Sequence, residues 1–445
     1  MMTPLRYVFL ILAALISLHY ILSFTNETYG NATSFTHLSE QFSGSASPNE
    51  SPDKHYNVGG PPASVDNKHY EAGAPPAPVD NDHHNTGAPS APDNEHQDAG
   101  APPAPPPVDS KDGGAPPPAY QHYNTTTPLQ HGRKANATIV MLARNGDLDG
   151  IVVSMKQMED RFNKKFNYPY IFLNEMDFSE EFKTRVSGLT DSPVQFGLIP
   201  HDDWYQPAWI DETRASAARA DMVEHKVIYG GSVSYRNMCR FNSGFFYRHE
   251  LLKPFKYYWR VEPDIKYFCD LDYDPFLVMQ DENKVYGFTL SLFEYEATIP
   301  TLWNTVKEFT NSNPGLLPPG NAMDFLSDDG GETYNRCHFW SNFEIGDLDF
   351  WRGEAYSKFF DFLDEKGGFY YERWGDAPVH SIGAALFAKK EQIHFFNDIG
   401  YRHEPFQHCP QGVAHAKGKC WCDQKQNFDY EWYSCLNKYE ALFKS

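Results

Sequence analysis

The sequence predicts an α/β sheet with crossover helices from residue 135 onward, because strand-like and helix-like segments alternate there at the spacing of βαβ units. The alternation comprises, in chain order, a strand at 137–145, a helix at 148–162, a strand at 170–174, a helix at 178–186 and a strand at 194–199. The strands are short apolar runs, whereas the first helix spaces its apolar residues three or four apart. Open α/β sheets bind ligands at the carboxyl ends of their strands, so we expect the functional residues there.

Composition and charge limit the possible functions. The 445-residue chain is 41% hydrophobic and 16% aromatic, which is enough to bury one or two large cores. Its formal net charge is -21, and no basic patch offsets this negative charge. The charge therefore argues against a nucleic-acid partner.

The N-terminus predicts a membrane anchor. Residues 7–24 carry no formal charge and are about long enough to cross a thin bilayer. A cleaved signal peptide is the alternative, but it usually has a shorter apolar part, and no Ala-x-Ala cleavage site follows Phe24. We therefore expect a cytoplasmic tail at 1–6, a transmembrane signal-anchor at 7–24 and the rest of the chain in the lumen of the secretory pathway.

Residues 25–134 predict a disordered lumenal stem. A unit that begins with histidine and is rich in Pro and Gly recurs about every 14 residues, and it holds almost no aliphatic side chains. Such a chain is an extended spacer with polyproline character, although its histidines leave metal binding as a second reading. Four glycosylation sequons lie in or next to this stem, at Asn26, Asn31, Asn124 and Asn136.

All seven cysteines lie after residue 238, and in an oxidising lumen they predict disulfides. An odd number leaves at least one thiol unpaired in a monomer. The alternative is a zinc cluster, because His408, Cys409 and His415 precede Cys420 and Cys422 closely in sequence.

A Glu-Pro-Asp turn follows a strand-like aromatic segment at 257–261. Pro263 ends the strand, so Glu262 and Asp264 are expected on a corner at the strand end. Arg260 lies two residues before Glu262, on the same face of the strand. Carboxylate ligands of this kind suit Mg²⁺ or Mn²⁺, which commonly keep positions open for substrate phosphates. The turn therefore predicts a divalent-metal site that faces a diphosphate.

Several longer blocks accompany this turn along the chain. They read YGGSVSYR at 229–236, MCRFNSGF at 238–245, YWRVEPD at 258–264, HFWSNFEI at 338–345 and RWGDAPVH at 373–380. In this order they resemble the fungal glycosyltransferase family 15, Golgi α-1,2-mannosyltransferases that use GDP-mannose. The resemblance runs from about residue 135 to the C-terminus and does not include the stem.

The resemblance implies a GT-A-like mixed sheet with flanking helices, and a catalytic domain at 135–445. It implies a Mn²⁺ cofactor bound to the donor diphosphate and held by Glu262 and His403, with His380 as a rival ligand. Asp264 is expected either to join them through a water or to shape the turn.

The other implied site residues contact the two substrates. Arg144 and Arg260 are expected to contact the nucleotide. Tyr235 is expected to contact the acceptor, a mannosylated glycoprotein or oligosaccharide.

Glu344 and Asp376 are the implied catalytic carboxylates. An α-linked donor that gives an α-mannoside retains configuration, which requires a carboxylate beneath the anomeric carbon on either a double-displacement or a front-face route. Glu344 matches the family's candidate nucleophile, and stabilisation of the sugar by hydrogen bonds is its alternative role. Asp376 is expected to bind or position the sugar.

The sequence therefore predicts a retaining α-1,2-mannosyltransferase in the Golgi membrane, single-pass type II with a lumenal catalytic domain. It is expected to act in protein O- or N-glycosylation and cell-wall mannan synthesis. The alternatives are an inactive lectin-like or structural cell-wall protein, and a glycoside hydrolase.

Overall fold

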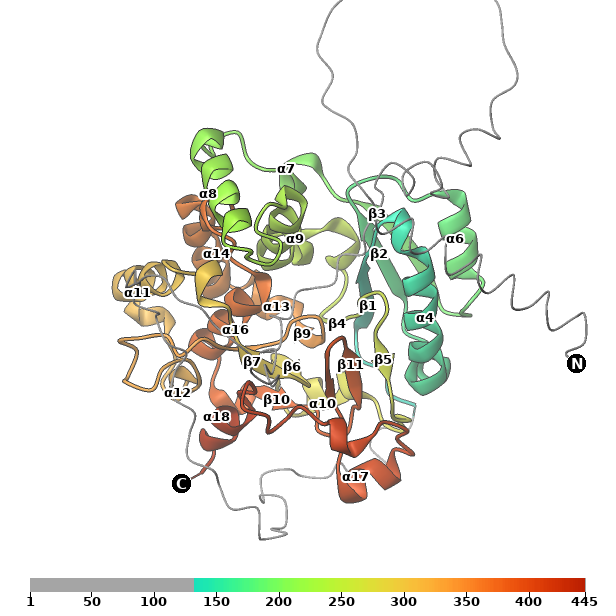
Figure 1. Ribbon diagram of the computed structural model, residues 1–445. Helices are drawn as coiled ribbons and strands as arrows, with labels where there is room; N and C mark the ends of the chain where they lie inside the picture. The colour runs from blue at the N-terminus through green and yellow to red at the C-terminus, as the bar shows by residue number, and fades with distance from the viewer. Residues whose placement is uncertain (1–131, 445) are drawn as a thin grey trace, which may run out of the picture. The chain divides into compact units, whose positions relative to one another are not determined.

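The computed structural model describes residues 132–444, and a seven-stranded sheet lies at the centre of this part (Figure 1). The strand order is β10-β6-β9-β4-β1-β2-β3. Strands β1 (Ala137–Leu142), β2 (Tyr170–Asn174), β3 (Val194–Leu198) and β4 (Tyr257–Arg260) are mutually parallel. Strand β9 (Glu344–Asp347) runs antiparallel to both of its neighbours, β4 and β6 (Tyr286–Phe288), and β10 (Ile393–Phe395) is parallel to β6.

Two smaller sheets flank the large one. The first has the order β12-β11-β5 and consists of β5 (Lys266–Tyr267), β11 (Tyr401–His403) and β12 (Phe406–His408). The second pairs β7 (Ser291–Phe293) with β8 (Cys337–Phe339). The first small sheet brings the C-terminal part of the chain next to the segment that follows β4.

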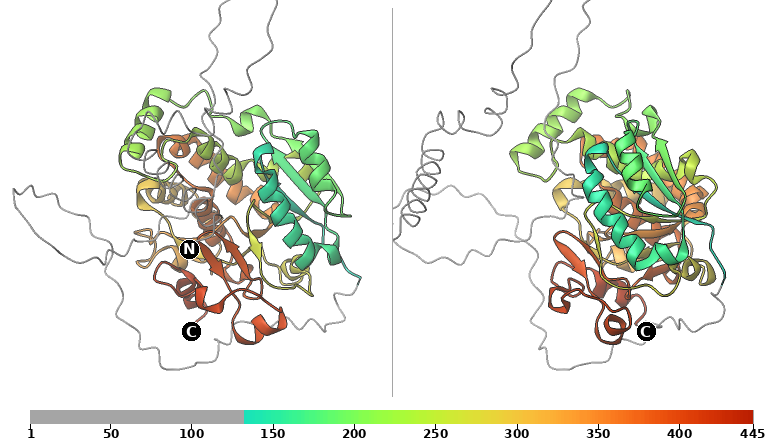
Figure 2. Two further views of the ribbon diagram at one scale, coloured as in Figure 1. Left: turned by 45° about the vertical axis from the view of Figure 1, so that its right-hand side comes forward. Right: turned by 90° about the vertical axis from the view of Figure 1, so that its right-hand side faces the viewer.

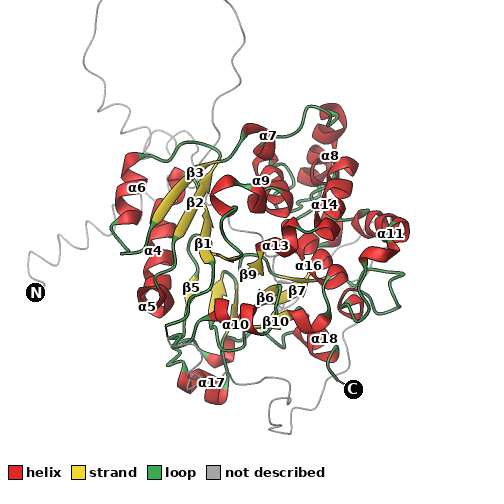
Figure 3. Cartoon of the chain, turned by 180° about the vertical axis from the view of Figure 1, so that it is seen from behind, coloured by secondary structure: helices red, strands yellow, loops and turns green. Residues whose placement is uncertain are grey.

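Helices cover both faces of the large sheet, as expected of parallel strands. Helices α4 (Leu148–Met158) and α6 (Glu180–Ser187) pack on one face (Figure 2, right), and α9 (Val233–Gly244), α14 (Glu354–Lys366) and α16 (Asp376–Phe387) group on the other (Figure 3). The remaining helices are α5 (Lys164–Phe166), α7 (His201–Trp204), α8 (Glu212–Glu224), α10 (Pro275–Asp281), α11 (Leu302–Ser312), α12 (Met323–Leu326), α13 (Leu348–Arg352), α15 (Gly368–Tyr371), α17 (Gly412–Lys417) and α18 (Leu436–Ala441).

The side chains of β1 show why both faces are apolar. Ile139 and Met141 pack with α4 and α6, whereas Val140 joins the cluster under α9, α14 and α16. Successive residues of a strand point to opposite faces, so an uninterrupted apolar run fills two cores at once.

The five predicted elements are present, with shifted ends. The first strand stops at Leu142 and not at residue 145, because the backbone N–H of Arg144 donates to Asp147 Oδ2 in the turn that opens α4. The predicted helix at 148–162 is α4 followed by a π-helical turn at Glu159–Asn163.

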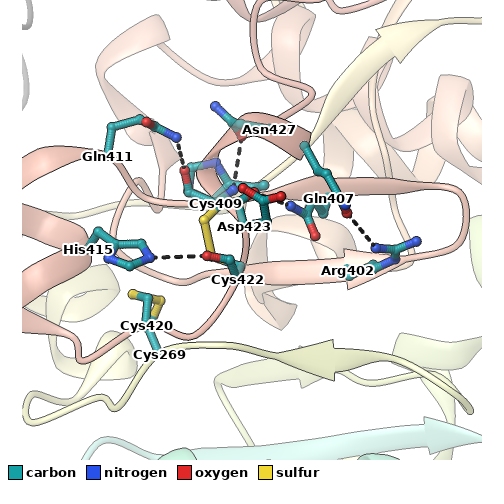
Figure 4. Close-up of a disulfide and its surroundings, with 12 residues drawn as sticks. Cys269, Arg402, Gln407, Cys409, Gln411, His415, Cys420, Cys422, Asp423 and Asn427 are labelled. Atoms are coloured by element: carbon teal, nitrogen blue, oxygen red, sulfur yellow. Dashed lines mark hydrogen bonds between the residues drawn. A yellow bond between two sulfur atoms is a disulfide. The ribbon is translucent and has the colours of Figure 1, made fainter.

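Three disulfides join Cys269 to Cys420, Cys337 to Cys435, and Cys409 to Cys422, and Cys239 is left as a buried free thiol. The predicted disulfides are thus confirmed. The zinc alternative is wrong, because the sulfurs of Cys409 and Cys422 are bonded to each other and His415 Nε2 instead contacts the Cys422 carbonyl at 3.2 Å (Figure 4). The Cys269–Cys420 bridge joins the segment after β12 to the segment after β5. The Cys409–Cys422 bridge closes a loop within the segment after β12.

The prediction of a single-pass Golgi membrane protein is contradicted. Within residues 132–444 no helix has the length and apolar character needed to cross a bilayer. The predicted tail at 1–6 and anchor at 7–24 lie outside the described residues, as does the predicted stem at 25–134 up to residue 131.

A buried histidine in β12 makes the stability of the fold depend on pH. His408 Nδ1 lies 2.9 Å from both carboxylate oxygens of Asp429, and Nε2 lies 3.0 Å from the Asn397 carbonyl oxygen. Burial opposes the charged form, but Asp429 more than offsets this and raises the pKa of His408 above its usual value. The protonated ring therefore stabilises the fold fully below about pH 6.5, and this contribution is lost as the pH rises through the folded-state pKa.

We expect His408→Gln to lower the free energy of unfolding at pH 6 by about 3 kcal/mol, because Asp429 loses its buried partner. The loss should shrink as the pH rises. Urea unfolding at several pH values between 6 and 9 measures it, with the exposed His225→Gln as control. An equal loss at all pH values would contradict this role of the charge.

Candidate active site

The candidate site lies where the parallel strands of the large sheet end. Arg144 follows β1, Glu175 follows β2, and Arg260 is the last residue of β4. Because β9 is antiparallel, its first residue, Glu344, lies at this same edge, directly opposite Arg260 in the register. The topology thus gathers residues that are up to 200 positions apart in the sequence (344 minus 144).

A cleft opens at this edge. It is lined by Leu142, Ala143, Arg144, Asp147, Glu175, Trp204, Ser234, Tyr235, Met238, Asn242, Arg260, Glu262 and Pro263. Four predicted site residues, Arg144, Tyr235, Arg260 and Glu262, therefore share one cleft. A smaller cavity shares Leu142, Asn242 and Arg260 with the cleft and reaches Glu344.

Arg260 links three carboxylates of the site. Its Nη1 lies 2.6 Å from Asp376 Oδ2 and 4.0 Å from Glu344 Oε1, and its Nη2 donates to Glu262 Oε1. The residue is 8% exposed, and although burial alone would lower the pKa of this guanidinium, the carboxylates raise it well above its ordinary value. Arg260 lines the cleft, and its contacts within the protein hold the acidic residues together.

Glu262 and His403 form a pair at the edge of the cleft. The antiparallel pairing of β11 with β5 brings His403 beside the Glu-Pro-Asp corner, and His403 Nε2 lies 3.5 Å from Glu262 Oε2. Burial disfavours ionised Glu262, but Arg260 and His403 outweigh it and lower the pKa of this carboxyl. Trp340 packs edge-on against the imidazole with ring centroids 5.1 Å apart.

The structure places Asp264 on the other side of the corner. Its backbone has a φ of 57°, and its N–H donates to the Gly150 carbonyl at 3.2 Å. A Cβ at Gly150 would lie 2.6 Å from Asp264 Oδ2, so the carboxylate rests directly on the first turn of α4 and requires a glycine there. This position favours the second expectation for Asp264, a residue that shapes the turn.

Asp376 and Glu344 are both buried beside Arg260. Asp376 also accepts a hydrogen bond from Ser341 Oγ at 2.8 Å, and although burial raises the pKa of Asp376, Arg260 lowers it below its usual value. Glu344 is 1% exposed and contacts His380 through Oε2. Both ring nitrogens of His380 are engaged within the protein, one on Glu344 and the other on the Asn242 carbonyl.

Arg144 and Tyr235 lie on the outer walls of the cleft. Arg144 Nε donates to Glu175 Oε1 at 2.8 Å, and its Nη2 donates to Ser234 Oγ at the start of α9. Tyr235 stacks on Tyr229 with ring centroids 4.4 Å apart, and the Arg373 guanidinium lies 5.1 Å from the Tyr235 ring centre.

The pairing of β4 with β9 is set by a glycine. Gly346 lies opposite Tyr258, and a Cβ at this position would fall 2.6 Å from Tyr258 Cε1. The Tyr258 ring is fixed in turn, because Trp351 Nε1 donates to its hydroxyl at 3.0 Å. This contact sets Glu344 opposite Arg260.

Four residues that the sequence did not assign to these roles support the predicted ones: Glu175 and Ser234 hold Arg144, Ser341 holds Asp376, and His380 holds Glu344. His380 follows Asp376 by four residues in the block at 373–380. In a helix this spacing puts both side chains on the same face, and it could have indicated that His380 lies near the site.

An α/β sheet with buried carboxylates and the Glu262–His403 pair at its strand ends is the arrangement that the resemblance to glycosyltransferases implied. The sequence profile of the family described as glycolipid 2-alpha-mannosyltransferase matches residues 110–443, and the chain belongs to this family, glycosyltransferase family 15.

Its relatives carry mannosyltransferase names. "Glycolipid 2-alpha-mannosyltransferase 1" of Candida albicans is 57% identical over 310 residues, which cover 69% of this chain and 72% of that protein. "Alpha-1,2 mannosyltransferase KTR1" of Saccharomyces cerevisiae is 52% identical over 326 residues, which cover 73% of this chain and 83% of that protein.

Solved structures share the fold. Core-mannan synthase A from Aspergillus fumigatus, in a Mn/GDP form, is 44% identical with a TM-score of 0.66 and covers 70% of this chain and 86% of its own. Ktr4p from S. cerevisiae in complex with GDP is 41% identical with a TM-score of 0.68 and covers 72% of this chain and 84% of its own. The predicted family and mixed α/β glycosyltransferase fold are thereby confirmed.

Proposed function

We propose that residues 135–445 form the catalytic unit of a retaining α-1,2-mannosyltransferase that transfers mannose from GDP-mannose to a mannosylated glycoprotein or oligosaccharide. The observation that carries this proposal is that Glu262, which pairs with His403, lines the same cleft as Arg144 and Tyr235. The names of the relatives support the sugar, and the GDP and manganese in solved structures of relatives support the donor and cofactor.

The residues at the Glu-Pro-Asp corner fit Mn²⁺. His403 Nδ1 lies 3.1 Å from the Glu404 carbonyl oxygen, which only accepts, so in the neutral ring that binds a metal the hydrogen stays on Nδ1 and Nε2 presents its lone pair. That lone pair faces Glu262 Oε2, a second electron-pair donor, at 3.5 Å. One carboxylate oxygen and one imidazole nitrogen suit Mn²⁺ and leave positions for diphosphate oxygens. When bound, the metal neutralises the charge that develops on the departing diphosphate.

Arg144 holds the nucleotide in this proposal. Its guanidinium is oriented by Glu175 and Ser234 on the cleft wall, and a planar cation there suits a phosphate or a guanine edge. Tyr235, on the facing helix α9, offers a ring and a hydroxyl to the acceptor sugar.

Glu344 and Asp376 act on the transferred sugar in this scheme. The bond from mannose C1 to the diphosphate oxygen breaks, a bond from C1 to the acceptor 2-hydroxyl oxygen forms, and the hydroxyl proton passes to the departing GDP or to water. Glu344 stabilises the positive charge on C1, either through a covalent bond or as an ion pair, and both routes retain the α configuration. Arg260 keeps Asp376 and Glu262 ionised and in place beside it.

We expect the purified protein to make an α-1,2-linked dimannoside from GDP-mannose and methyl α-mannoside, with the linkage and anomeric configuration read by NMR. EDTA should abolish transfer and Mn²⁺ should restore it. Glu262→Ala and His403→Ala should each lower kcat/KM by about 100-fold or more, because a bound metal supplies several kcal/mol of transition-state stabilisation.

Glu404→Ala is the matched control, since Glu404 is the adjacent exposed carboxylate and pairs with Arg402 at 2.7 Å. It should leave transfer unchanged. Transfer that persists in EDTA would refute the metal site, release of free mannose from mannosides would indicate a hydrolase, and absence of both reactions would indicate a binding protein.

A further inference from the structure

A buried histidine behind the site contacts one oxygen of Glu344. His380 lies on α16 and is 0% exposed. Its Nδ1 lies 3.0 Å from Glu344 Oε2, and its Nε2 lies 2.9 Å from the Asn242 carbonyl oxygen. The ring thus bridges α16, the first residue of β9 and α9.

The chemistry of these contacts sets where the protons lie. A carbonyl oxygen only accepts, so Nε2 carries a hydrogen and donates it to Asn242. The contact between Nδ1 and Glu344 Oε2 then holds one further proton, either on an imidazolium beside a carboxylate or on a carboxyl beside a neutral imidazole. In both states Glu344 Oε2 is occupied by the ring.

The second oxygen of Glu344 lies on the Arg260 side of the carboxylate. Glu344 Oε1 lies 4.0 Å from Arg260 Nη1, and Glu344 lines the small cavity next to the cleft. The other walls of that cavity are largely apolar and include Val140, Leu142, Leu173, Phe241, Phe246 and Tyr258. The Tyr258 and Tyr286 hydroxyls also interact with the Glu344 carboxylate. The carboxylate is therefore fixed in one orientation, with Oε2 on the His380 ring and Oε1 on the Arg260 side.

Aromatic rings lock the imidazole. Trp351 stacks on His380 with ring centroids 4.5 Å apart and an interplanar angle of 22°. Phe246 and Tyr356 pack around it at 5.9 and 6.0 Å. The ring is therefore held in one orientation, away from solvent.

We propose that His380 positions Glu344. His380 binds Glu344 Oε2, so that Glu344 Oε1 is directed at the anomeric carbon of the donor sugar. This inference rests on the proposed function, in which Glu344 faces the transferred mannose. His380 acts through Glu344 and does not itself touch the substrate.

Two isosteric substitutions separate the two contacts of the ring. His380→Asn places an amide nitrogen near the Nδ1 position and keeps a donor to Glu344, whereas His380→Gln places one near Nε2 and keeps the donor to Asn242. We expect His380→Asn to stay within about 10-fold of the wild-type kcat and His380→Gln to lose about 100-fold, because small misplacements of a reacting group have effects of that size. KM for GDP-mannose and the Kd of GDP with Mn²⁺ should be unchanged in both.

His408 supplies the matched control, because it has the same pattern of a carboxylate at Nδ1 and a carbonyl at Nε2 and is also fully buried. His408→Asn and His408→Gln should lower the melting temperature without a difference in kcat per folded molecule. Equal kcat for His380→Asn and His380→Gln, with GDP binding intact, would overturn the proposal.

Two further results keep the proposal distinct from the function on which it rests. A wild-type protein that transfers no mannose would refute the proposed function, whatever the His380 variants do. If the His380 variants do not fold, the ring nitrogens of ¹⁵N-histidine-labelled full-length protein give the answer: Glu344→Gln should shift the His380 signals, and unchanged signals would overturn the contact.

Discussion

Replacing Glu344 by glutamine should lower kcat for mannosyl transfer by about 100- to 1,000-fold, with little change in KM for GDP-mannose. The amide keeps the volume of the side chain and removes the negative charge that stabilises C1 only in the transition state, and losses of preorganised electrostatic groups have effects of this size. Steady-state kinetics of the radiolabelled transfer reaction measure both parameters. Binding of GDP with Mn²⁺, measured by calorimetry, should be unaffected because Glu344 lines the adjoining small cavity and not the cleft that Arg144 and Glu262 line.

Asp347→Asn is the control for Glu344→Gln. Asp347 is the last residue of β9 and 8% exposed, and its carboxylate caps α13 by accepting from the Asp349 N–H at 2.8 Å. Its conversion to an amide should leave kcat unchanged. If Glu344→Gln were as active as Asp347→Asn, Glu344 would have no part in the reaction.

Replacing Arg260 by methionine should destabilise the fold by about 3–5 kcal/mol at pH 7, because buried carboxylates lose their shared cation. In the wild type the pKa values of Glu262 and Asp376 are lowered, so their contribution to stability is present above the unfolded-state pKa and is lost as the pH falls through the folded-state values. In Arg260→Met the sign should reverse, since protonation at lower pH relieves the repulsion among the three acids. Urea unfolding at pH 7 and pH 5 measures the change.

Arg240→Met is the matched control for Arg260→Met. Arg240 is also buried on the same side of the sheet, and its Nε and Nη2 bind the two oxygens of Asp364 at 2.8 and 2.9 Å. A single carboxylate is left behind there, and its side chain is 16% exposed, so the loss should be smaller and should not reverse with pH. If the stability of Arg260→Met depended on pH as that of the wild type does, Arg260 would not be the cation that balances these carboxylates.

Local patterns predicted the strands and helices from 137 to 199 and placed Arg144 and the Glu-Pro-Asp corner at strand ends, because hydrophobic periodicity and proline act over a few residues. The chain's motif blocks located Glu344, Asp376 and His403 through the resemblance. The contacts of these residues were not predictable in this way. Arg260 meets Asp376 across 116 positions, and His380 meets Glu344 only because α16 packs behind an antiparallel strand. Such contacts depend on tertiary packing that no local pattern encodes.

Asp264 illustrates the same limit on a smaller scale. Two carboxylates flank Pro263, and local patterns alone do not separate them, although the resemblance implied Glu262 as the metal ligand. In the structure the backbone of Asp264 turns to a positive φ and its side chain rests on Gly150, while Glu262 faces His403. The division of roles at the corner therefore follows from how α4 packs against it.

The contact between Gly346 and Tyr258 makes β9 intolerant of changes in length. A strand that slips by one residue turns all its side chains to the opposite face, which would send the Glu344 carboxylate into the core under α4. A slip by two residues would keep the face but press Glu344 or Leu348 against the fixed Tyr258 ring, where only a glycine fits. Relatives that differ by insertions or deletions in this region should therefore carry them in the loop before Glu344, and the two-residue step from the acid to the glycine should be invariant in length.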